Sequence, residues 1–123
     1  MISIRLPWPP SNNTYYRNTQ SGTLISERGR SYRRSVLQHC LAQGIRRTAG
    51  PVRVVIHASP PDRRKRDLDN LLKGLLDSLT KAGAWDDDGL VDDLRIVRGE
   101  VKAGGEVLVT IEALAWKRHM VQI

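Results

Sequence analysis

A run of leucines at helical spacing constrains the fold of this chain more than any other feature. Between residues 68 and 79, leucine occupies positions i, i+3, i+4, i+7, i+8 and i+11, which places these side chains on one face of an α-helix. We expect Asp69 to cap the start of this helix and Gly83 to follow its last turn. The pattern therefore predicts an amphipathic helix with an apolar face made of Leu68, Leu71, Leu72, Leu75, Leu76 and Leu79.

Apolar residues at other spacings predict a second helix and two strands. Alternating apolar side chains at residues 2–6 and 52–58 indicate strands, and prolines follow both of them. Residues 8–22 are rich in turn formers and predict a loop. Helical spacing from residue 27 to residue 43, with Gly44 as its stop, predicts a helix whose apolar positions are Tyr32, Val36, Leu37, Cys40 and Leu41.

The last part of the chain predicts two more strands. Residues 94–101 and 106–113 each read as a strand, and the turn between them at residues 102–105 would join them as a hairpin. The whole pattern predicts a single small α+β domain over residues 1–115, with a mainly antiparallel or mixed sheet and two helices. Residues 116–123 show no clear period and are interpreted as a tail.

Length and composition limit the class of protein. A chain of 123 residues is enough for one domain, and 40% hydrophobic with 27% charged residues is a globular composition. The single cysteine, Cys40, excludes an internal disulfide and indicates a reducing, cytoplasmic setting. Arg5 and Pro7 interrupt any signal-peptide core, and no apolar run reaches the roughly 20 residues of a membrane span.

The net charge of +7 conceals a division along the chain. Residues 1–66 hold 13 of the 20 Lys and Arg against only Glu27 and Asp62, whereas residues 67–123 hold 7 cations against 11 acids. A basic half of this size indicates a polyanionic partner. Nucleic acid is favoured over an anionic membrane because no strongly amphipathic basic helix is evident. The alternative is a basic surface that serves only solubility.

Charges of both signs stand side by side in the middle of the chain. Four consecutive cations at residues 63–66 precede Asp67 and Asp69, and three more aspartates stand at residues 86–88. If residue 67 closes an extended segment, the first two carboxylates point the same way. Clustered carboxylates are the ligands that Mg²⁺ or Mn²⁺ requires. The sequence therefore contains a candidate divalent-metal site.

This arrangement suits the hydrolysis of a phosphodiester bond. A bound ion would polarise the phosphoryl oxygen and lower the pKa of an attacking water. Lys73 stands four residues after Asp69 on the same polar face, where it would stabilise the developing negative charge or position the water. The DNA backbone would be held by the neighbouring cations Arg63, Arg64, Lys65 and Arg66.

Each of these residues also has a simpler interpretation. Asp69 can be only a helix cap, Lys73 only its ion-pair partner, and residues 86–88 only a solvated loop. A calcium-binding EF-hand is excluded because Arg95 stands where its twelfth ligand, a bidentate Glu, belongs. Nucleophilic catalysis has little support, because no nucleophile motif occurs and the histidines are scattered at His39, His57 and His119.

The sequence resembles the RusA family of Holliday-junction resolvases, which are small homodimeric endonucleases of bacteria and their phages. The resemblance extends to about Glu112 and does not cover the tail. It is carried, in the family's order and spacing, by LPWPPSNNTYYR (6–17), PDRRKRDLDNLLK (61–73) and LTKAGAWDDDGLVDD (79–93).

The resemblance implies roles for individual residues. In that family, two aspartates of a D-L-D-N motif and a third after an aromatic residue bind Mg²⁺, which implies Asp67, Asp69 and Asp88. Asp86 or Asp87 is an alternative for the third ligand, and the family's catalytic lysine matches Lys73. The early loop is expected to donate to phosphates, with its tyrosines stacking on exposed bases, through Asn12, Asn13, Tyr15 and Arg17.

The same resemblance implies the substrate and the assembly. It predicts a homodimer that resolves a four-way DNA junction by two symmetric nicks, one from each subunit, leaving 5′-phosphate and 3′-hydroxyl ends. The expected cofactor is Mg²⁺, with Mn²⁺ as a substitute and no other small molecule, and no membrane is involved. The alternatives are a non-enzymatic basic DNA-binding protein and a nuclease for flaps or forks.

Overall fold

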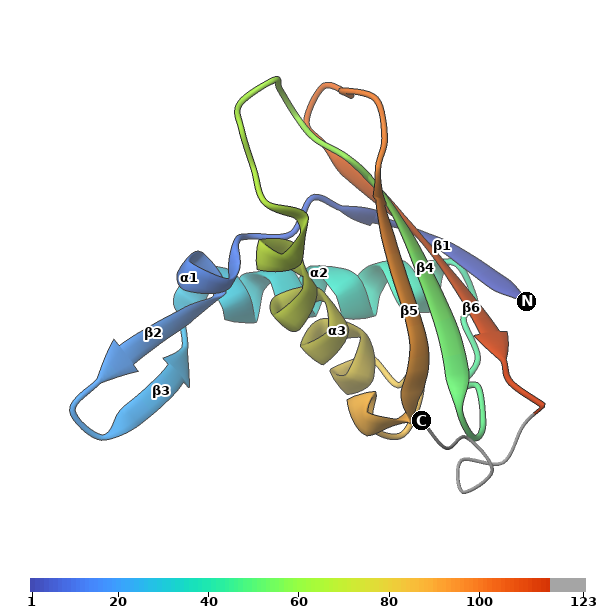
Figure 1. Ribbon diagram of the computed structural model, residues 1–123. Coiled ribbons are helices and arrows are strands. Elements are labelled where there is room, and N and C mark those ends of the chain that lie inside the picture. Colours follow the sequence, from blue (N-terminus) through green and yellow to red (C-terminus); the bar gives the residue numbers. More distant parts are fainter. Residues whose placement is uncertain (116–123) are drawn as a thin grey trace, which may run out of the picture.

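The computed structural model describes residues 1–115, which form one four-stranded sheet with helices packed on one face (Figure 1). A separate two-stranded sheet projects from this body. The elements follow in the order β1 (Ile2–Pro7), α1 (Asn12–Tyr15), β2 (Tyr16–Thr19), β3 (Gly22–Ile25), α2 (Glu27–Ala42), β4 (Val52–Ser59), η1 (Leu68–Leu71), α3 (Leu72–Lys81), η2 (Asp88–Leu90), β5 (Val91–Arg98) and β6 (Glu106–Ala113).

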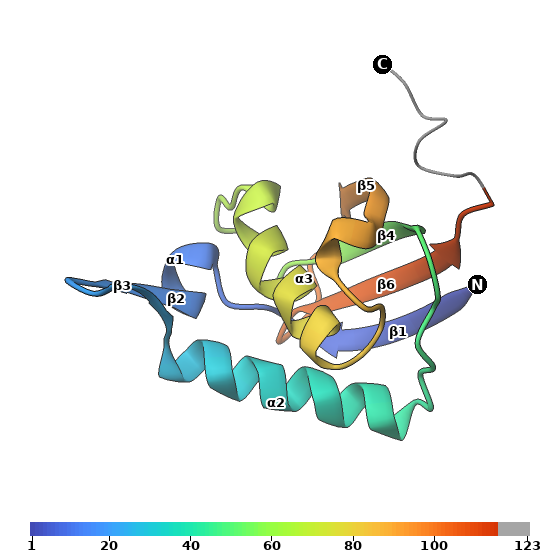
Figure 2. The same cartoon turned by 90° about the horizontal axis from the view of Figure 1, so that it is seen from below.

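The main sheet is mixed, with strand order β1-β6-β4-β5. Strands β1 and β4 both pair antiparallel with β6, and β4 pairs parallel with β5. A parallel pair needs a crossover connection, and α3 supplies it between β4 and β5. Figure 2 shows α2 and α3 on the same side of the sheet. The predicted α+β class with a mixed sheet is confirmed.

The predicted hairpin of residues 94–101 and 106–113 is wrong. Both strands exist, but β5 and β6 do not pair, because β4 lies between them. The physical reason is the burial of β4, whose inward side chains Val52, Val54, Ile56 and Ala58 have no exposed surface. A strand this apolar is most stable at the centre of the sheet, where neighbours on both edges satisfy its backbone.

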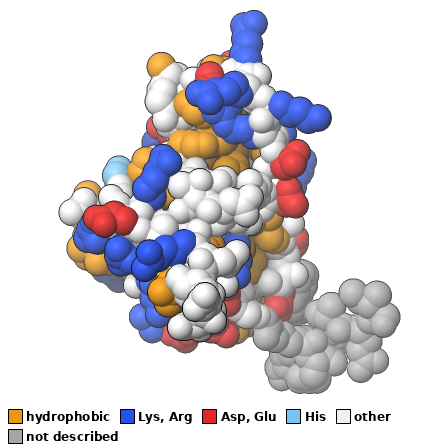
Figure 3. Space-filling model, turned by 90° about the vertical axis from the view of Figure 1, so that its left-hand side faces the viewer, with side chains coloured by type: hydrophobic (Ala, Val, Ile, Leu, Met, Phe, Trp, Pro, Cys, Tyr) orange, Lys and Arg blue, Asp and Glu red, His pale blue; other side chains and the backbone are white. Residues whose placement is uncertain are grey.

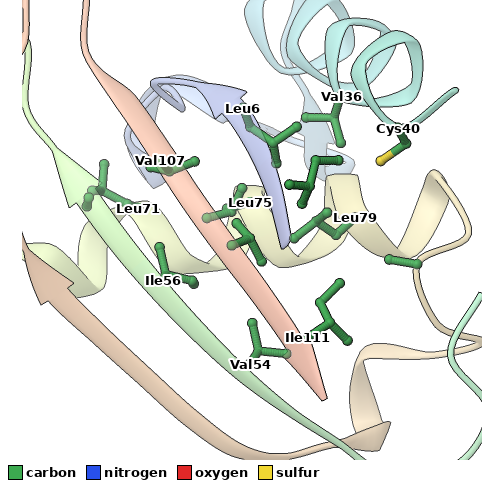
Figure 4. Packing of buried hydrophobic residues seen from close by; sticks show 14 of the residues in the cluster. Leu6, Val36, Cys40, Val54, Ile56, Leu71, Leu75, Leu79, Val107 and Ile111 are labelled. Carbon is green, nitrogen blue, oxygen red and sulfur yellow. The ribbon is translucent and has the colours of Figure 1, made fainter. Parts of the chain in front are cut away.

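The core lies between the sheet and the two long helices (Figure 4). Leu71, Leu75 and Leu79 point from the η1–α3 segment toward the inward face of β4 and β6. Strand β1 and helix α2 add further core side chains to this layer, among them Leu6, Val36 and Cys40. The leucine pattern therefore predicted the buried face of this helix.

Two details of the predicted helices differ from the structure. Leu37 and Leu41 of α2 are 42% and 72% exposed, so the buried stripe of this helix is narrower than predicted. Asp69 does not cap a helix: it lies inside the 3₁₀ turn η1, and Asp67 precedes that turn in extended backbone. Gly83 follows α3 with a φ of 84°, as predicted for that position.

The segment at residues 8–22, predicted as a loop from its turn formers, contains the short helix α1 and the strand β2. Helix α1 brings Tyr15 into the core, where its side chain is fully buried. A Cβ atom added at Gly74 of α3 would lie 2.6 Å from Cδ2 of Tyr15, so the absence of a side chain there allows the ring to rest directly on the helix. The tyrosine hydroxyl hydrogen-bonds Ser78 Oγ at 2.9 Å.

Gly74→Ala tests this packing. Helix propensity alone would make the variant more stable by about 1 kcal/mol. We expect instead a net destabilisation of about 1–3 kcal/mol, because the new methyl group overpacks against the Tyr15 ring. Urea unfolding would measure the change, with Gln38→Ala at an exposed position of α2 as the control. A Gly74→Ala protein more stable than the original would contradict the close contact.

Among the helices of residues 1–115, none has both the length and the apolar character that crossing a membrane requires. The predicted tail, residues 116–123, lies outside the described residues.

Candidate active site

One face of the η1–α3 segment carries three charged residues at intervals of four. Asp69 and Lys73 are exposed and Asp77 is half-buried, and side chains at this spacing lie above one another on a helix. Within residues 1–115, no ion pair joins Lys73 to either aspartate. The ammonium group lies instead 4.8 Å from the centre of the Tyr16 ring. Lys73 is therefore held without a neutralising partner.

Tyr16 connects this face to the β2–β3 hairpin. It is the first residue of β2, and its hydroxyl donates a hydrogen bond to Oδ2 of Asp77. Burial, followed by this hydrogen bond, raises the pKa of Tyr16 far above its usual value. A tyrosine hydroxyl is already protonated at neutral pH, and the raised pKa keeps this one a donor to a higher pH than usual.

Trp85 anchors the acidic loop that follows α3. Its side chain is fully buried, and its indole nitrogen donates to Oγ1 of Thr80 at 2.7 Å. The first aspartate of the loop, Asp86, pairs with Arg47 at 2.5 Å. Asp86 thus has a cationic partner, whereas Asp87 and Asp88 form no ion pair within residues 1–115. Which of Asp86 and Asp87 is the alternative to Asp88 as third ligand stays a prediction.

Asp88 begins η2 and lies near the end of α3. Partial burial, followed by the negative charges of Asp77 and Asp87, raises the pKa of its carboxyl group. The structure therefore brings Asp88 close to Asp77, which sequence reasoning did not single out. The available signal was its spacing, four residues after Lys73.

The candidate metal ligands do not form a closed cluster. Over residues 1–115, no group of three or more His, Cys, Asp or Glu side chains is arranged to hold a metal ion. The donor chemistry nevertheless fits a hard divalent cation, because Asp67, Asp69 and Asp88 are exposed carboxylates without an ion-pair partner in the described chain. Their convergence on one ion stays a prediction.

A groove of about 780 Å³ lies at the start of the η1–α3 segment. Asp67 and Asn70 line one part of it, and the loop from Pro7 to Pro10 and the first half of α2 line the rest. Its cationic lining residues come from two separate segments, α2 and the loop before η1: Arg28, Arg64, Lys65 and Arg66. Figure 3 shows Lys and Arg side chains gathered on the face that carries the β2–β3 hairpin.

The four predicted backbone-binding cations are not equivalent. Arg63 and Lys65 are exposed, and neither forms an ion pair within residues 1–115. Arg66 is an internal brace: it pairs with Asp62 at 2.7 Å and lies 5.8 Å from the centre of the Trp8 ring. Arg64 also approaches Asp62, at 3.3 Å. Two of the four are therefore fully available to a ligand.

The predicted DNA-binding residues of the early loop also divide into exposed side chains and side chains held by internal contacts. Asn13 and Arg17 are exposed, whereas the Asn12 amide donates to the backbone oxygen of Asp69 at 3.4 Å. Oδ1 of Asn12 is buried without a partner. Stacking of Tyr15 on DNA bases is wrong, because that side chain is fully buried and its hydroxyl also accepts from Arg33 at 2.8 Å.

Known endodeoxyribonucleases resemble this sequence over most of its length. The sequence matches the family model for endodeoxyribonuclease RusA over residues 7–112. The crossover junction endodeoxyribonuclease RusA of Shigella sonnei (strain Ss046) is 49% identical over 113 residues, covering 89% of this chain and 92% of the relative. The protein of that name from Escherichia coli (strain K12) is 48% identical with the same coverage. The one from Enterobacteria phage 82 is 48% identical over 111 residues, 88% and 91% of the two chains. The chain therefore belongs to the RusA family of endodeoxyribonucleases.

Proposed function

We propose that this chain is a divalent-metal-dependent endonuclease that resolves four-way DNA junctions in the cytoplasm. It acts as a homodimer, and each subunit cuts one of two opposing strands. The proposal is supported by relatives named crossover junction endodeoxyribonuclease over about nine-tenths of the chain. The single observation that carries it is that exposed Asp67 lines a groove together with four cations, while Asp69 and Lys73, also exposed, follow it along the η1–α3 segment.

Each element of the site has a proposed task. Asp67, Asp69 and Asp88 would hold Mg²⁺, or Mn²⁺ in its place, and a bound ion of this kind polarises the scissile phosphate and acidifies a water molecule. Lys73 faces the charge that develops on the phosphoryl oxygens. Attack of water on phosphorus breaks the bond to the 3′ oxygen, which leaves as a hydroxyl, and the phosphate stays on the 5′ end.

The proposed task of the cations is to bind and orient the DNA, and they take no part in the chemical step. Arg63 and Lys65 project from the loop before η1, and Asn13 and Arg17 from the segment around α1 and β2. Such contacts to phosphates fix register and orientation without reading sequence. We propose that the domain over residues 1–115 contains all of these functions and that residues 116–123 are an appended tail.

A cleavage assay on synthetic DNA tests the proposal. Fixed and mobile four-way junctions, flaps, forks and linear duplex would be compared in a titration of Mg²⁺. We expect cleavage that needs the metal and prefers junctions, with paired nicks in opposing strands. Binding without cleavage at any metal concentration would favour the non-enzymatic alternative, and a preference for flaps or forks would favour the other nuclease.

The salt dependence of junction binding tests the role of the exposed cations. We expect log K to fall steeply with log salt, and the double variant Arg63→Ala/Lys65→Ala to reduce the slope by about 0.9 for each lost phosphate contact. These two residues are preferred to Arg66, which braces the loop through Asp62. Fluorescence anisotropy measures the slope, and Arg46→Ala/Arg95→Ala removes two exposed cations elsewhere as a control. An unchanged slope in the first variant would exclude this loop from phosphate binding.

A further inference from the structure

We propose that Tyr16 is a positioning residue that keeps the Lys73 ammonium free for the phosphate by occupying Asp77. The inference rests on the proposed function, in which Lys73 faces the reacting phosphoryl group. It concerns a contact between the β2–β3 hairpin and α3, and it gives Tyr16 and Asp77 a role in the reaction although neither touches the substrate.

The spacing along α3 creates a competitor for Lys73. Asp77 stands four residues after Lys73, and opposite charges at this interval form ion pairs on helices. An ammonium group neutralised in this way would contribute little positive charge at a phosphate. In the structure the pair does not form: no ion pair between these two side chains occurs within residues 1–115.

Two contacts of Tyr16 explain why Lys73 and Asp77 do not pair. Its hydroxyl donates to Oδ2 of Asp77, which gives the carboxylate another partner. Its ring lies under the Lys73 ammonium, 4.8 Å from Nζ to the ring centre, so the cation rests on an aromatic face. A ring attracts the cation without cancelling its charge, and the ammonium therefore stays available to an anion.

The core fixes the Tyr16 ring in this place. Its ring centre is 4.6 Å from that of Tyr15, at an interplanar angle of 53°. Tyr15 is in turn immobilised by its contact with Gly74 and by hydrogen bonds to Ser78 and Arg33. The position of the Lys73 ammonium is thus determined by packing that begins in the centre of the domain.

Nuclear magnetic resonance of the metal-free protein tests the contact directly. The ring current of Tyr16 should move the ε-CH₂ protons of Lys73 upfield. In Tyr16→Phe, which keeps the ring but lacks the hydroxyl, Asp77 is released, and we expect the ammonium to move toward it and the upfield shift to shrink. In Tyr16→Phe/Asp77→Asn the shift should return. A normal ε-CH₂ shift in the original protein, or no change in Tyr16→Phe, would overturn the inference.

Single-turnover cleavage tests whether these contacts of Tyr16 raise the rate of the chemical step through Lys73. We expect Tyr16→Phe to cut junctions about tenfold more slowly with unchanged affinity. Complete loss of a fixed donor that stabilises developing charge lowers the rate about 10²–10³-fold, and a displaced ammonium should lose only part of that effect. Adding Asp77→Asn should recover rate relative to Tyr16→Phe alone, and Tyr16→Phe should cost nothing further in a Lys73→Ala background. Thr19→Val, which removes a hydroxyl from the same hairpin, is the matched control and should cut at the original rate.

The two measurements separate failure of this inference from failure of the proposed function. If the original protein did not cleave junctions, the proposed function would fall, while the resonance shifts would still show whether Tyr16 holds Lys73 away from Asp77. If cleavage were intact and Tyr16→Phe slowed it equally with and without Lys73, Tyr16 would act by another route and the inference would be wrong.

Discussion

Asp69→Asn is expected to abolish cleavage and to bind a four-way junction as tightly as the original protein or more tightly. In the proposed site, the substitution would remove one anionic ligand of the metal ion, and with the ion the water that it would activate. In the absence of metal, the Asp69 carboxylate repels the incoming phosphates, so its removal lowers that repulsion. The fold should persist, because Asp69 is exposed and its side chain caps no helix.

Two assays on the same protein separate the effects. Gel-shift affinity in EDTA reports binding, and single-turnover cleavage in Mg²⁺ reports chemistry. Glu27→Gln is a matched control: it also removes one negative charge, from a side chain that is 87% exposed on α2, and it should leave cleavage intact. Asp69→Asn that still nicks junctions near the original rate would be incompatible with the proposed site, and loss of folding would favour a structural role.

Local periodicity predicted the elements of the fold well. The strands at residues 2–6 and 52–58 and the helix from residue 27 are present within one or two residues of their predicted bounds. Burial on one face imposes a period of 2 or 3.6 on the sequence, and such a signal needs no knowledge of distant residues. The leucine helix was placed correctly for the same reason.

Strand pairing is decided by contacts far apart in the sequence, and there the prediction failed. β5 and β6 are neighbours along the chain, joined by a turn with two glycines at positive φ, Gly104 and Gly105, so a hairpin was the natural inference. The alternation of apolar residues in β5 and β6 is equally compatible with the two strands pairing with each other and with each of them pairing with β4. What decides the order is the insertion of β4, which is buried through Val54 and Ile56 at the centre of the sheet.

The candidate site was predictable to the extent that its chemistry is local. The carboxylates Asp67 and Asp69 and the following Lys73 lie within one short segment. The contact between Tyr16 and Asp77 joins residues 61 positions apart, and turn formers in the early loop concealed the helix that carries Tyr15 into the core. A residue that acts by arranging another group leaves no local pattern to detect.

Lys73→Ala should cut junctions far more slowly while folding and binding DNA almost normally. Lys73 is exposed on α3, where alanine is favourable, and its ammonium has no ion-pair partner within residues 1–115, so no buried charge is left behind. Loss of a cation fixed at the developing phosphoryl charge should cost about 10²–10³ in the rate of bound complexes.

The control for Lys73→Ala is Lys81→Ala, which removes an exposed lysine from the other end of the same helix and should leave the rate unchanged. Single-turnover cleavage at saturating protein isolates the chemical step from binding, and anisotropy in EDTA gives the affinity. One lost phosphate contact is a small part of the total binding free energy, so affinity should change less than tenfold. If affinity fell tenfold or more while bound complexes still cut at the original rate, Lys73 would anchor the DNA and another group would have to face the developing charge.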